Sequence, residues 1–361
     1  MICFINRSTV DYDIRLQKYV QACIETNTPY CVIGWDRVQN CSKVYPNEYQ
    51  YKAFSPYGNG FKSLIPLIGW VFYVLYNLFK HRKQYQVIHA CNIENYLVAY
   101  PAKCFGKKIV LDIYDSTESN IETKMAQKCD ALILPSNHRL EQIKVKREEL
   151  RRYLEVENVP VFHEGINKKA EPEFPDRIHL SYVGVMQRNI RGIENLLSLV
   201  NEDKRFILDI AGTGDGLDKV IEEMAKTNDR INYHGKVDYD TALNLMSNSD
   251  FIVALYYLNC PSHKYASPNK YYESLYLAKP VITTKGTLVG ETVDEYNTGY
   301  TIGDTKEELA SIFRNVDHPD FLNAYLRKSK NCCERWENIY AHYFKNVTKG
   351  TYLQMMNSLI R

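Results

Sequence analysis

The sequence lacks a strong excess of charge of either sign, and it contains no low-complexity tract or short repeat. Its 361 residues include 45 Lys and Arg against 43 Asp and Glu, so the formal net charge is only +2. Proteins that bind nucleic acid through its phosphates carry a basic patch or a clearly basic domain. The charge balance therefore indicates no nucleic-acid partner. With 45% hydrophobic and 24% charged residues, the chain has an ordinary globular composition.

Cysteine is present, but without the spacing that a disulfide framework or a metal site requires. None of the ten cysteines forms a C-x-x-C pair, and no Cys/His cluster has zinc-ligand spacing. The opening "MICFINRS" has too short an apolar run for a signal peptide. We therefore expect reduced thiols in a cytoplasmic protein that has no structural metal.

A long apolar run is also missing. The most apolar segment, residues 63–79 ("SLIPLIGWVFYVLYNLF"), is shorter than the ~20 residues of a spanning helix, and it contains Pro66, Gly69 and Asn77. A basic "KHRK" follows it. We expect no transmembrane span. Two interpretations stay open: a helix packed on a sheet, or an interfacial helix that gives residues 61–83 a peripheral membrane contact.

Short apolar runs alternate with longer helical patterns along the whole chain, which indicates βαβ units and parallel sheets. The predicted strands lack polar alternation, as expected for sheets that are covered on both faces. They fall into two series: 1–6, 30–35, 86–90, 108–114 and 131–136, and then 178–184, 205–212, 231–235, 250–257 and 280–284. The predicted fold class is α/β, with two doubly wound Rossmann-like domains that face a cleft.

The charged segment 166–177 contains two Pro and has no periodicity, so we interpret it as the interdomain linker. The predicted domains are residues 1–168 and 169–339, and we expect a C-terminal helix over 340–361 to pack back on the first domain. In doubly wound folds, ligands bind at the carboxyl ends of the strands.

The stretch "SPNKYYESLYLAKPVITT", residues 267–284, follows a predicted strand and opens a helix. Ser267 is a suitable N-cap and Pro268 a suitable first helical residue, followed by Asn269. A helix start of this kind binds anions. Lys270 can meet a phosphate, and Glu273, one turn deeper, can accept hydrogen bonds from the two hydroxyls of a ribose. The alternative is an exposed i, i+3 ion pair.

A second candidate lies in "SYVGVMQRNIRGIENLL", residues 181–197. A strand ends at Gly184, and the following loop carries Arg188 and Arg191. Two guanidinium groups at a strand-to-helix turn suit a diphosphate, because Arg binds phosphate oxygens bidentately. The alternative is a solvated basic loop.

The segment "AGTGDG", residues 211–216, differs from the dinucleotide fingerprint because its third Gly is one position early. It also lies in the middle of the chain. We interpret it as a tight turn that allows close approach of the backbone, and a nicotinamide enzyme is disfavoured.

In the first domain, His89 and Asp115 lie at the ends of predicted strands ("QVIHACN" and "LDIYDS"). They could contact a sugar or an acceptor hydroxyl, although a buried histidine is commonly a hydrogen-bonded structural residue. "DYD" occurs at 11–13 and 238–240. Asp13 also fits a helix N-cap, so we expect no metal site there.

These segments occur in an order that resembles the retaining glycosyltransferases of family 4, also described as glycosyl transferases group 1, which have the GT-B fold. The similarity rests on "DYDIRLQKYVQACIETNTPYCVIGWDR", "QVIHACN", "YVGVMQRNIRGIENLL", "LDIAGTGDG", "INYHGKV" and "SPNKYYESLYLAKPVITT". It covers nearly the whole chain.

The resemblance implies transfer of a sugar from a nucleotide diphosphate sugar to a hydroxyl, with retained configuration and without metal or cofactor. Arg191 matches the position of the family's phosphate-binding Lys, and Glu273 that of its ribose-binding Glu. The turn at Gly235 and Lys236 matches a segment whose backbone lies beside the base. The expected catalytic residues are His89, Asp115, Arg191 and Lys270. The expected donor-binding residues are Gly184, Arg188, Gly235, Lys236, Ser267, Pro268, Asn269 and Glu273.

The sequence also departs from the family pattern. Tyr265 stands where an acidic residue is usual, eight positions before Glu273, so we expect the "SPNK" loop backbone to contact the donor sugar instead. Val185 stands where the family usually has an Arg, and we expect Arg188 to substitute for that Arg. In addition, Tyr12 stands where the family usually has Pro, and Cys91 and Asn92 stand where its strand end has a second His and an Asp.

The sequence therefore predicts a glycosyltransferase that acts on a glycan or lipid-linked acceptor in cell-surface polysaccharide synthesis, in the cytoplasm or at the inner face of the membrane. Three alternatives stay open. They are a sugar-nucleotide epimerase of the same fold, a metal-dependent transferase, and a nucleotide-sugar-binding protein that has lost activity, as Tyr265 suggests.

Overall fold

The structure is a computed structural model that describes residues 1–37, 39, 41, 43–55, 63–162, 172 and 174–360. The chain divides into two compact units: unit 1 comprises Met1–Val161 and His342–Arg361, and unit 2 comprises Phe162–Ala341. The predicted linker, 166–177, falls largely on 163–171 and 173, outside the described residues, as do residues 61 and 62 of the predicted membrane contact.

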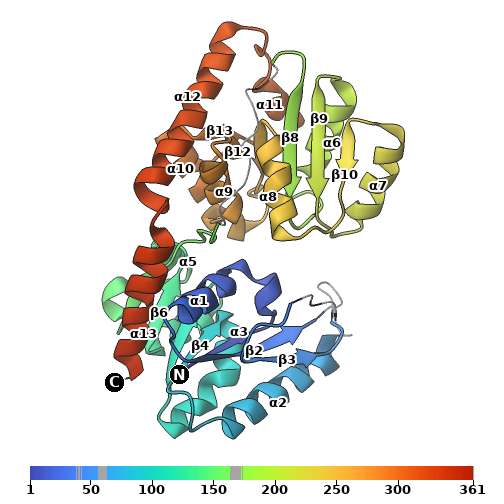
Figure 1. The fold of residues 1–361 in the computed structure, drawn as a ribbon. Coiled ribbons are helices and arrows are strands. Elements are labelled where there is room, and N and C mark those ends of the chain that lie inside the picture. Colours follow the sequence, from blue (N-terminus) through green and yellow to red (C-terminus); the bar gives the residue numbers. More distant parts are fainter. Residues whose placement is uncertain are drawn as a thin grey trace. The chain divides into compact units, whose positions relative to one another are not determined.

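Unit 1 is built on a seven-stranded parallel sheet of order β3-β2-β1-β4-β5-β6-β7 (Figure 1). All five predicted strands are present, whereas β3 and β7 were not predicted. Both lie at an edge of the sheet and are only partly buried, so they lack the apolar run that marks a central strand. The strands are β1 Ile2–Asn6, β2 Tyr30–Asp36, β3 Glu48–Lys52, β4 Val87–Cys91, β5 Lys108–Asp112, β6 Ala131–Leu134 and β7 Tyr153–Glu155.

Helices cover both faces of this sheet, and successive strand residues alternate between two apolar cores. One core joins the sheet to α2 (Leu64–Lys80), α3 (Asn92–Ala99) and α4 (Asn120–Lys128). The other joins it to α1 (Ile14–Glu25) and to the C-terminal α13 (Leu353–Ile360). The remaining helical segments are η1 Val10–Tyr12, η3 Tyr100–Phe105, η4 Arg147–Glu149, α5 Arg139–Gln142 and η7 Phe344–Tyr352.

Two helix predictions of unit 1 can be checked directly. Asp13 is the N-cap of α1, because its carboxylate accepts a hydrogen bond of 2.8 Å from the backbone N–H of Leu16. The apolar segment forms α2, which buries Trp70, Val74 and Leu78 against the sheet. None of the helices in the described ranges combines the length and the apolar character that crossing a bilayer requires.

Unit 2 is built on a six-stranded parallel sheet of order β10-β9-β8-β11-β12-β13. The five predicted strands are present, and the unpredicted β13 is again an edge strand. The strands are β8 Ile178–Val183, β9 Phe206–Ala211, β10 Ile231–Tyr233, β11 Phe251–Ala254, β12 Val281–Thr284 and β13 Gly299–Ile302.

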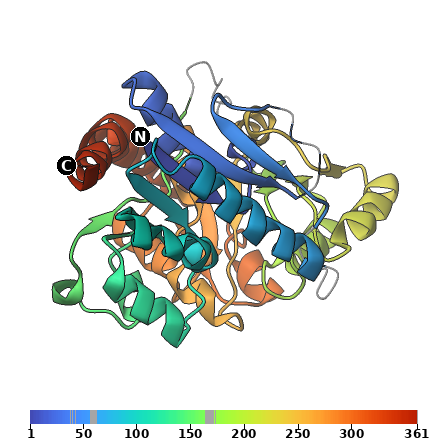
Figure 2. The ribbon, with the colours of Figure 1, turned by 90° about the horizontal axis from the view of Figure 1, so that it is seen from below.

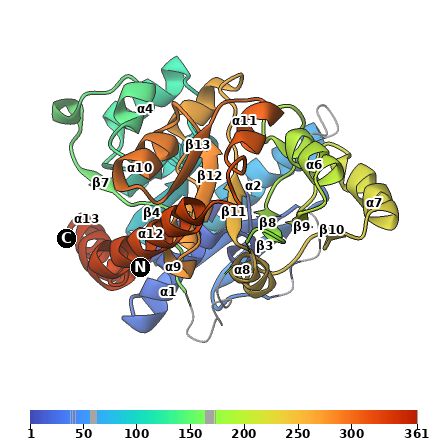
Figure 3. The same ribbon diagram turned by 90° about the horizontal axis from the view of Figure 1, so that it is seen from above.

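The sheet of unit 2 is also covered on both faces, and Figure 3 shows α6 and α8 on opposite sides of it. The larger core includes α6 (Ile193–Glu202), α7 (Leu217–Thr227), α11 (Lys306–Ser311) and α12 (Pro319–Arg335). The smaller one includes α8 (Tyr239–Asn248) and α9 (Asn269–Leu277). The other elements are η5 Pro261–Tyr265, α10 Leu288–Tyr296 and η6 Trp336–Tyr340.

A buried ionic network lies in unit 1, at the carboxyl end of β5. The Arg15 guanidinium contacts both carboxylate oxygens of Asp112, at 2.7 and 3.1 Å. Tyr19 donates a hydrogen bond of 3.0 Å to Asp112, and His89 Nε2 lies 3.1 Å from it. His89 Nδ1 lies 2.9 Å from the hydroxyl of Tyr352, so the network connects the sheet to the C-terminal segment.

The charge on Asp112 depends on these partners. Burial raises the pKa of its carboxyl, but the Arg15 guanidinium and His89 lower it by more, so that it falls to about 2. Asp112 is therefore ionised at neutral pH, and it is stable in the core only because a cation faces it.

Replacing Arg15 with Met should therefore destabilise the protein strongly. The substitution leaves a buried carboxylate without its cation, which costs about 3–5 kcal/mol of unfolding free energy. Chemical denaturation followed by circular dichroism measures the loss. The double variant Arg15→Met/Asp112→Asn should recover part of it, because the uncompensated charge is gone. A loss below about 1 kcal/mol in the single variant would show that the network contributes little.

Candidate functional site

The candidate site lies in unit 2, at the carboxyl ends of β8, β9, β10 and β11, and it depends on backbone contacts between the loops that follow them. The N–H of Gly212 donates to the carbonyl of Gly235 at 2.7 Å, and that of Met186 donates to the carbonyl of Thr213 at 3.1 Å. These bonds hold the loops after β8, β9 and β10 against one another.

Glycine permits this close approach. A Cβ on Gly212 would lie 1.9 Å from the carbonyl oxygen of Gly184, and one on Gly214 would lie 2.2 Å from that of Met186. Both glycines also have φ values near +140°, which L side chains rarely adopt. The prediction that "AGTGDG" is a tight turn with close backbone approach is confirmed, and the neighbouring backbone is that of the β8 loop.

The start of α9 differs by one residue from the prediction. Pro268 is the N-cap, with extended φ and ψ, and Asn269 is the first helical residue. Ser267 precedes the cap and was wrongly expected to be the N-cap; its hydroxyl lies 3.4 Å from that of Tyr272. Because proline has no side-chain acceptor, the N-cap residue of α9 makes no side-chain hydrogen bond to the first turn. A helix start of this kind can accept an anion.

Lys270 lies in this first turn, and its ammonium group points toward the end of β8. A Cβ on Gly184 would lie 3.0 Å from Lys270 Nζ, so the missing side chain leaves the space that the ammonium occupies. Nζ also lies 4.8 Å from the ring centroid of Tyr182. Burial, together with the nearby Arg191, lowers the pKa of Lys270 to about 8, although Glu273 opposes the shift.

Glu273 lies one turn further along α9 and is 4% exposed. Burial raises the pKa of its carboxyl to about 7, while the Lys270 ammonium acts in the opposite direction. Each side chain therefore shifts the pKa of the other, and both are largely removed from solvent. They differ from the exposed i, i+3 ion pair that was the alternative interpretation.

Arg191 is the second cation near Lys270. Its Cζ lies 4.5 Å from the ring centroid of Tyr256, and its Nε donates a hydrogen bond of 3.1 Å to the side chain of Gln187. The aromatic ring and the amide hold the guanidinium without neutralising it. The structure thus places two cations, each over a tyrosine ring, beside the start of α9.

The other predicted donor residues lie in different surroundings. Arg188 is exposed, and both its backbone N–H and its Nε donate to Asp215 at 3.1 Å, so it fits the solvated-loop interpretation. Gly235 has a φ of +63° and open space beside its Cα, and Lys236 is exposed. Tyr265 lies in η5, where the Lys264 ammonium is 5.3 Å from its ring centroid.

The predicted residues of unit 1 do not share one setting. His89 is fully buried, and both ring nitrogens face protein groups of the Asp112 network, which agrees with a structural role. The side chain of Asp115, in contrast, is exposed, and Arg139 lies 3.9 Å from it. Asp115 therefore keeps a carboxylate that an acceptor could reach, whereas His89 has no ring nitrogen without a protein partner.

The sequence analysis missed the tyrosines that support the cations. Tyr182 lies within β8 and Tyr256 follows β11, and both sit in apolar runs that predict only burial. The one available signal for these tyrosines was an aromatic residue near the end of a strand, close to a position where a cation was expected. Arg15 and Asp112 were missed as well, because 97 positions separate them in the sequence.

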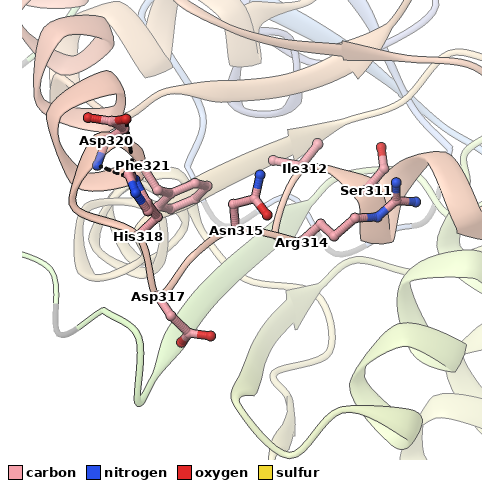
Figure 4. Close-up of a pocket in the computed structure, with 8 residues that line it drawn as sticks. All are labelled: Ser311, Ile312, Arg314, Asn315, Asp317, His318, Asp320 and Phe321. Carbon is pink, nitrogen blue, oxygen red and sulfur yellow. Dashed lines mark hydrogen bonds and ion pairs between the residues drawn. The ribbon is translucent and has the colours of Figure 1, made fainter.

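A cavity of about 680 Å³ lies elsewhere in unit 2, around the loop between α11 and α12 (Figure 4). Asp317, one of its lining residues, lies 3.9 Å from Arg205, which directly precedes β9. The cavity is therefore at the amino ends of the strands, opposite the candidate site. Its polar lining consists of Ser311, Arg314, Asn315, Asp317, His318 and Asp320.

Comparisons with known proteins give a family match and a fold. Residues 177–316 match the family model "Glycosyl transferases group 1". No curated protein sequence matches the chain. Sucrose-phosphate synthase from Thermosynechococcus elongatus has a TM-score of 0.70 at 16% identity, over 99% of both chains.

Two further solved structures have the same architecture. HepE from Anabaena, in complex with UDP and glucose, has a TM-score of 0.69 at 15% identity, over 99% of both chains. WaaG, a glycosyltransferase of lipopolysaccharide biosynthesis, has a TM-score of 0.65 at 11% identity, over 96% of this chain and 98% of its own. The predicted fold class is confirmed: two Rossmann-like α/β units of the GT-B type. The domain match and the fold together support a glycosyltransferase enzyme.

Proposed function

We propose that this chain transfers a sugar from a nucleotide diphosphate sugar to a hydroxyl of a glycan or lipid-linked acceptor, with retention of configuration. In this proposal unit 2 binds the donor and unit 1 the acceptor. The reaction serves cell-surface polysaccharide synthesis at the cytoplasmic side of a membrane. HepE, which shares the fold, is described in complex with UDP and with UDP-glucose. That description supports the choice of donor class.

The observation that carries the proposal is the pair of cations, Lys270 and Arg191, at the start of α9, where the N-cap residue Pro268 offers no side-chain acceptor. Arg191 is close enough to Lys270 for its guanidinium to lower the pKa of the lysine, and both cations rest on tyrosine rings. Two adjacent cations repel each other, so their proximity has a cost that a bound diphosphate would remove. A diphosphate would also accept hydrogen bonds from backbone N–H groups at the start of α9.

The same groups would stabilise the leaving group. When the bond from the sugar to the phosphate breaks, negative charge grows on the diphosphate, and fixed positive groups stabilise that charge in the transition state. The departing phosphate can itself take the proton of the acceptor hydroxyl, so the reaction does not require a base from the protein. This is consistent with the engagement of both His89 ring nitrogens inside unit 1.

In this proposal Glu273 binds the ribose, and the chain uses no metal or cofactor. A carboxylate with two oxygens suits the two ribose hydroxyls. Among the described residues, no three His, Cys, Asp or Glu side chains form a group that could hold a metal ion. Activity that persists in an excess of chelator would support a metal-independent reaction.

Thermal shift is the first test of the proposal. A nucleotide that binds only the folded protein stabilises it by about 2.7 kcal/mol at a hundredfold excess over Kd. One of UDP, GDP, ADP or TDP should therefore raise the melting temperature, and slow hydrolysis of the matching sugar nucleotide should follow. Stabilisation without any release of sugar would instead indicate a binding protein, and isomerisation of the donor without an acceptor would indicate an epimerase.

Replacing either cation should reduce turnover while the fold survives. Lys270→Ala or Arg191→Ala removes a group that stabilises the leaving diphosphate, which typically costs about 100- to 1000-fold in kcat. Steady-state kinetics with the donor identified by thermal shift measures the effect. Lys226→Ala, on the exposed face of α7, is the matched control and should retain activity. Near-normal turnover in both site variants would end the phosphate assignment.

The affinity for the nucleotide should fall as the pH rises above about 8, because Lys270, whose pKa is about 8, then loses its charge. The decline can reach about tenfold per pH unit. In Lys270→Arg the guanidinium stays charged, so its affinity should stay level over the same range. Isothermal titration calorimetry at several pH values measures both proteins. Equal declines in the two would show that another group causes the pH dependence.

The ring of Tyr256 should matter more than its hydroxyl. Tyr256→Leu removes the surface on which Arg191 rests, and a cation–π contact of about 0.5–2 kcal/mol corresponds to a roughly 2- to 30-fold weaker nucleotide affinity. Tyr256→Phe keeps the ring and should bind almost normally. Melting curves without ligand confirm that both variants fold. Equal losses in the two variants would assign the effect to the hydroxyl instead.

A further inference from the structure

The outward face of α2 in unit 1 is apolar along its full length. From Ile65 onward its exposed apolar side chains recur every three or four residues, and they lie on one side of the helix, opposite the buried Trp70 and Val74. Figure 2 shows α2 as the long blue helix that crosses the front of the view. We call these side chains, which are 48–81% exposed, the apolar ridge: Leu64, Ile65, Ile68, Phe72, Tyr76 and Phe79.

The ridge is specific to this helix. No other helix in the described ranges exposes more than two large apolar side chains. The ridge also continues onto η3, because the ring of Phe105, which is 51% exposed, lies 6.3 Å from that of Phe79. A contiguous apolar surface of this kind marks a contact with a partner or a membrane, whereas single exposed apolar residues need no explanation.

The one amide side chain of α2 does not interrupt the ridge. Asn77 is 5% exposed and points inward, where its Nδ2 donates a hydrogen bond of 2.9 Å to the carbonyl of Tyr73. Gly69 likewise faces the sheet: a Cβ there would lie 2.0 Å from the hydroxyl of Tyr51. Gly69 and Asn77, which interrupt the apolar run in the sequence, thus lie on the packed side, and the outward side is left apolar.

Cations lie at the C-terminal end of the ridge. The Arg82 guanidinium lies 4.2 Å from the ring centroid of Phe79, and the Lys80 ammonium 5.5 Å from that of Tyr76. Lys83 follows and is exposed. Within the described part of the chain, no carboxylate forms an ion pair with any of these three. The sequence from 49 to 93 contains no Asp or Glu, so no acidic residue near them in sequence offsets their charge.

We infer that this face of α2 binds the surface of an anionic lipid bilayer, with the helix lying in the plane of the interface. Apolar and aromatic side chains would enter the headgroup region, and Lys80, Arg82 and Lys83 would meet anionic headgroups. From Ile65 to Phe79 the ridge extends about 21 Å, at 1.5 Å per residue, so the helix lies on the bilayer and does not cross it.

Charge favours the membrane over a second copy of the chain. A symmetric dimer through the ridge would bring the basic end of each helix into an interface that has no acidic residue from this segment to receive it. An anionic bilayer supplies the complementary charge over the whole face. The inference rests on the proposed function for the identity of the acceptor, which it would hold at the membrane, but vesicle binding does not depend on that function.

Vesicle co-sedimentation of the full chain tests the inference without donor or acceptor. The chain should bind vesicles of phosphatidylcholine mixed with phosphatidylglycerol, bind weakly to phosphatidylcholine alone, and lose binding as salt rises. Phe72→Glu should lower the partition coefficient at least tenfold, and so should Ile65→Glu. Val220→Glu, which places the same charge on an exposed apolar position of α7, should bind like the parent chain.

A second pair of variants tests the charge. Lys80→Glu/Lys83→Glu should weaken binding to the anionic vesicles and leave the weak binding to phosphatidylcholine unchanged, while Lys226→Glu on α7 should have little effect. Failure of the parent chain to bind anionic vesicles would overturn the inference, as would unchanged binding by Phe72→Glu. A parent dimer that Phe72→Glu dissociates would also overturn it. Nucleotide binding is measured separately by thermal shift, so failure of the membrane inference can be distinguished from failure of the proposed transferase activity.

Discussion

The candidate site depends on the places where unit 2 has no side chain. At Gly212 and Gly214 the backbone of one loop contacts the backbone of the next, and any Cβ would enter the neighbouring carbonyl oxygen. At Gly184 the missing side chain leaves space for the ammonium of Lys270. The loops can therefore pack together at the carboxyl edge of the sheet, and the start of α9 faces them directly. The positions of the charged side chains in the site therefore depend on these glycines.

The manner in which the cations are held matters for what they can do. A carboxylate that neutralised Arg191 would have to be displaced before an anion could bind, and breaking a buried ion pair costs several kcal/mol. A tyrosine ring attracts the same cation by only about 0.5–2 kcal/mol and leaves its charge available. Gln187 adds a neutral hydrogen-bond acceptor. Lys270 differs from Arg191 because a carboxylate, Glu273, lies near it. Burial raises the pKa of Glu273 to about 7, so its protonation state can change when a charged ligand binds nearby.

The central strands could be predicted from the sequence because parallel strands covered on both faces form continuous apolar runs. The edge strands β3, β7 and β13 could not, because one side of an edge strand meets solvent or a loop, and "EYQYK" reads as polar. The start of α9 was misplaced by one residue, because both serine and proline are frequent there and only backbone angles decide between them. That Lys270 and Glu273 lie one turn apart on the same helix could be predicted, because helical spacing is local.

Long-range partners explain what the sequence could not show about the other candidate residues. Whether His89 is free or engaged depends on Tyr352, which is 263 positions away, and on Asp112, whose charge depends on Arg15. No pattern near His89 contains this information. The same is true of Arg188 and Arg191, which lie three residues apart: one is bound by Asp215 and the other rests on Tyr256. A position at the end of a strand therefore selects candidate site residues, and only the packing around each side chain shows which of them are held by other protein groups.

The apolar segment shows that two interpretations of one sequence need not exclude each other. A helix that packs on a sheet and a helix that contacts a membrane were treated as alternatives, although a helix has two faces and each can have its own partner. In α2 the large Trp70 and the polar Asn77 both point inward, which a hydropathy average over residues 63–79 cannot show. The buried face alone explains why the helix forms. It does not explain why Ile65 and Phe72 are apolar, since a protein with lysine or glutamate at these exposed positions would fold as well and be more soluble. We therefore infer a partner outside the fold for this second face, and the cations at its end favour an anionic surface.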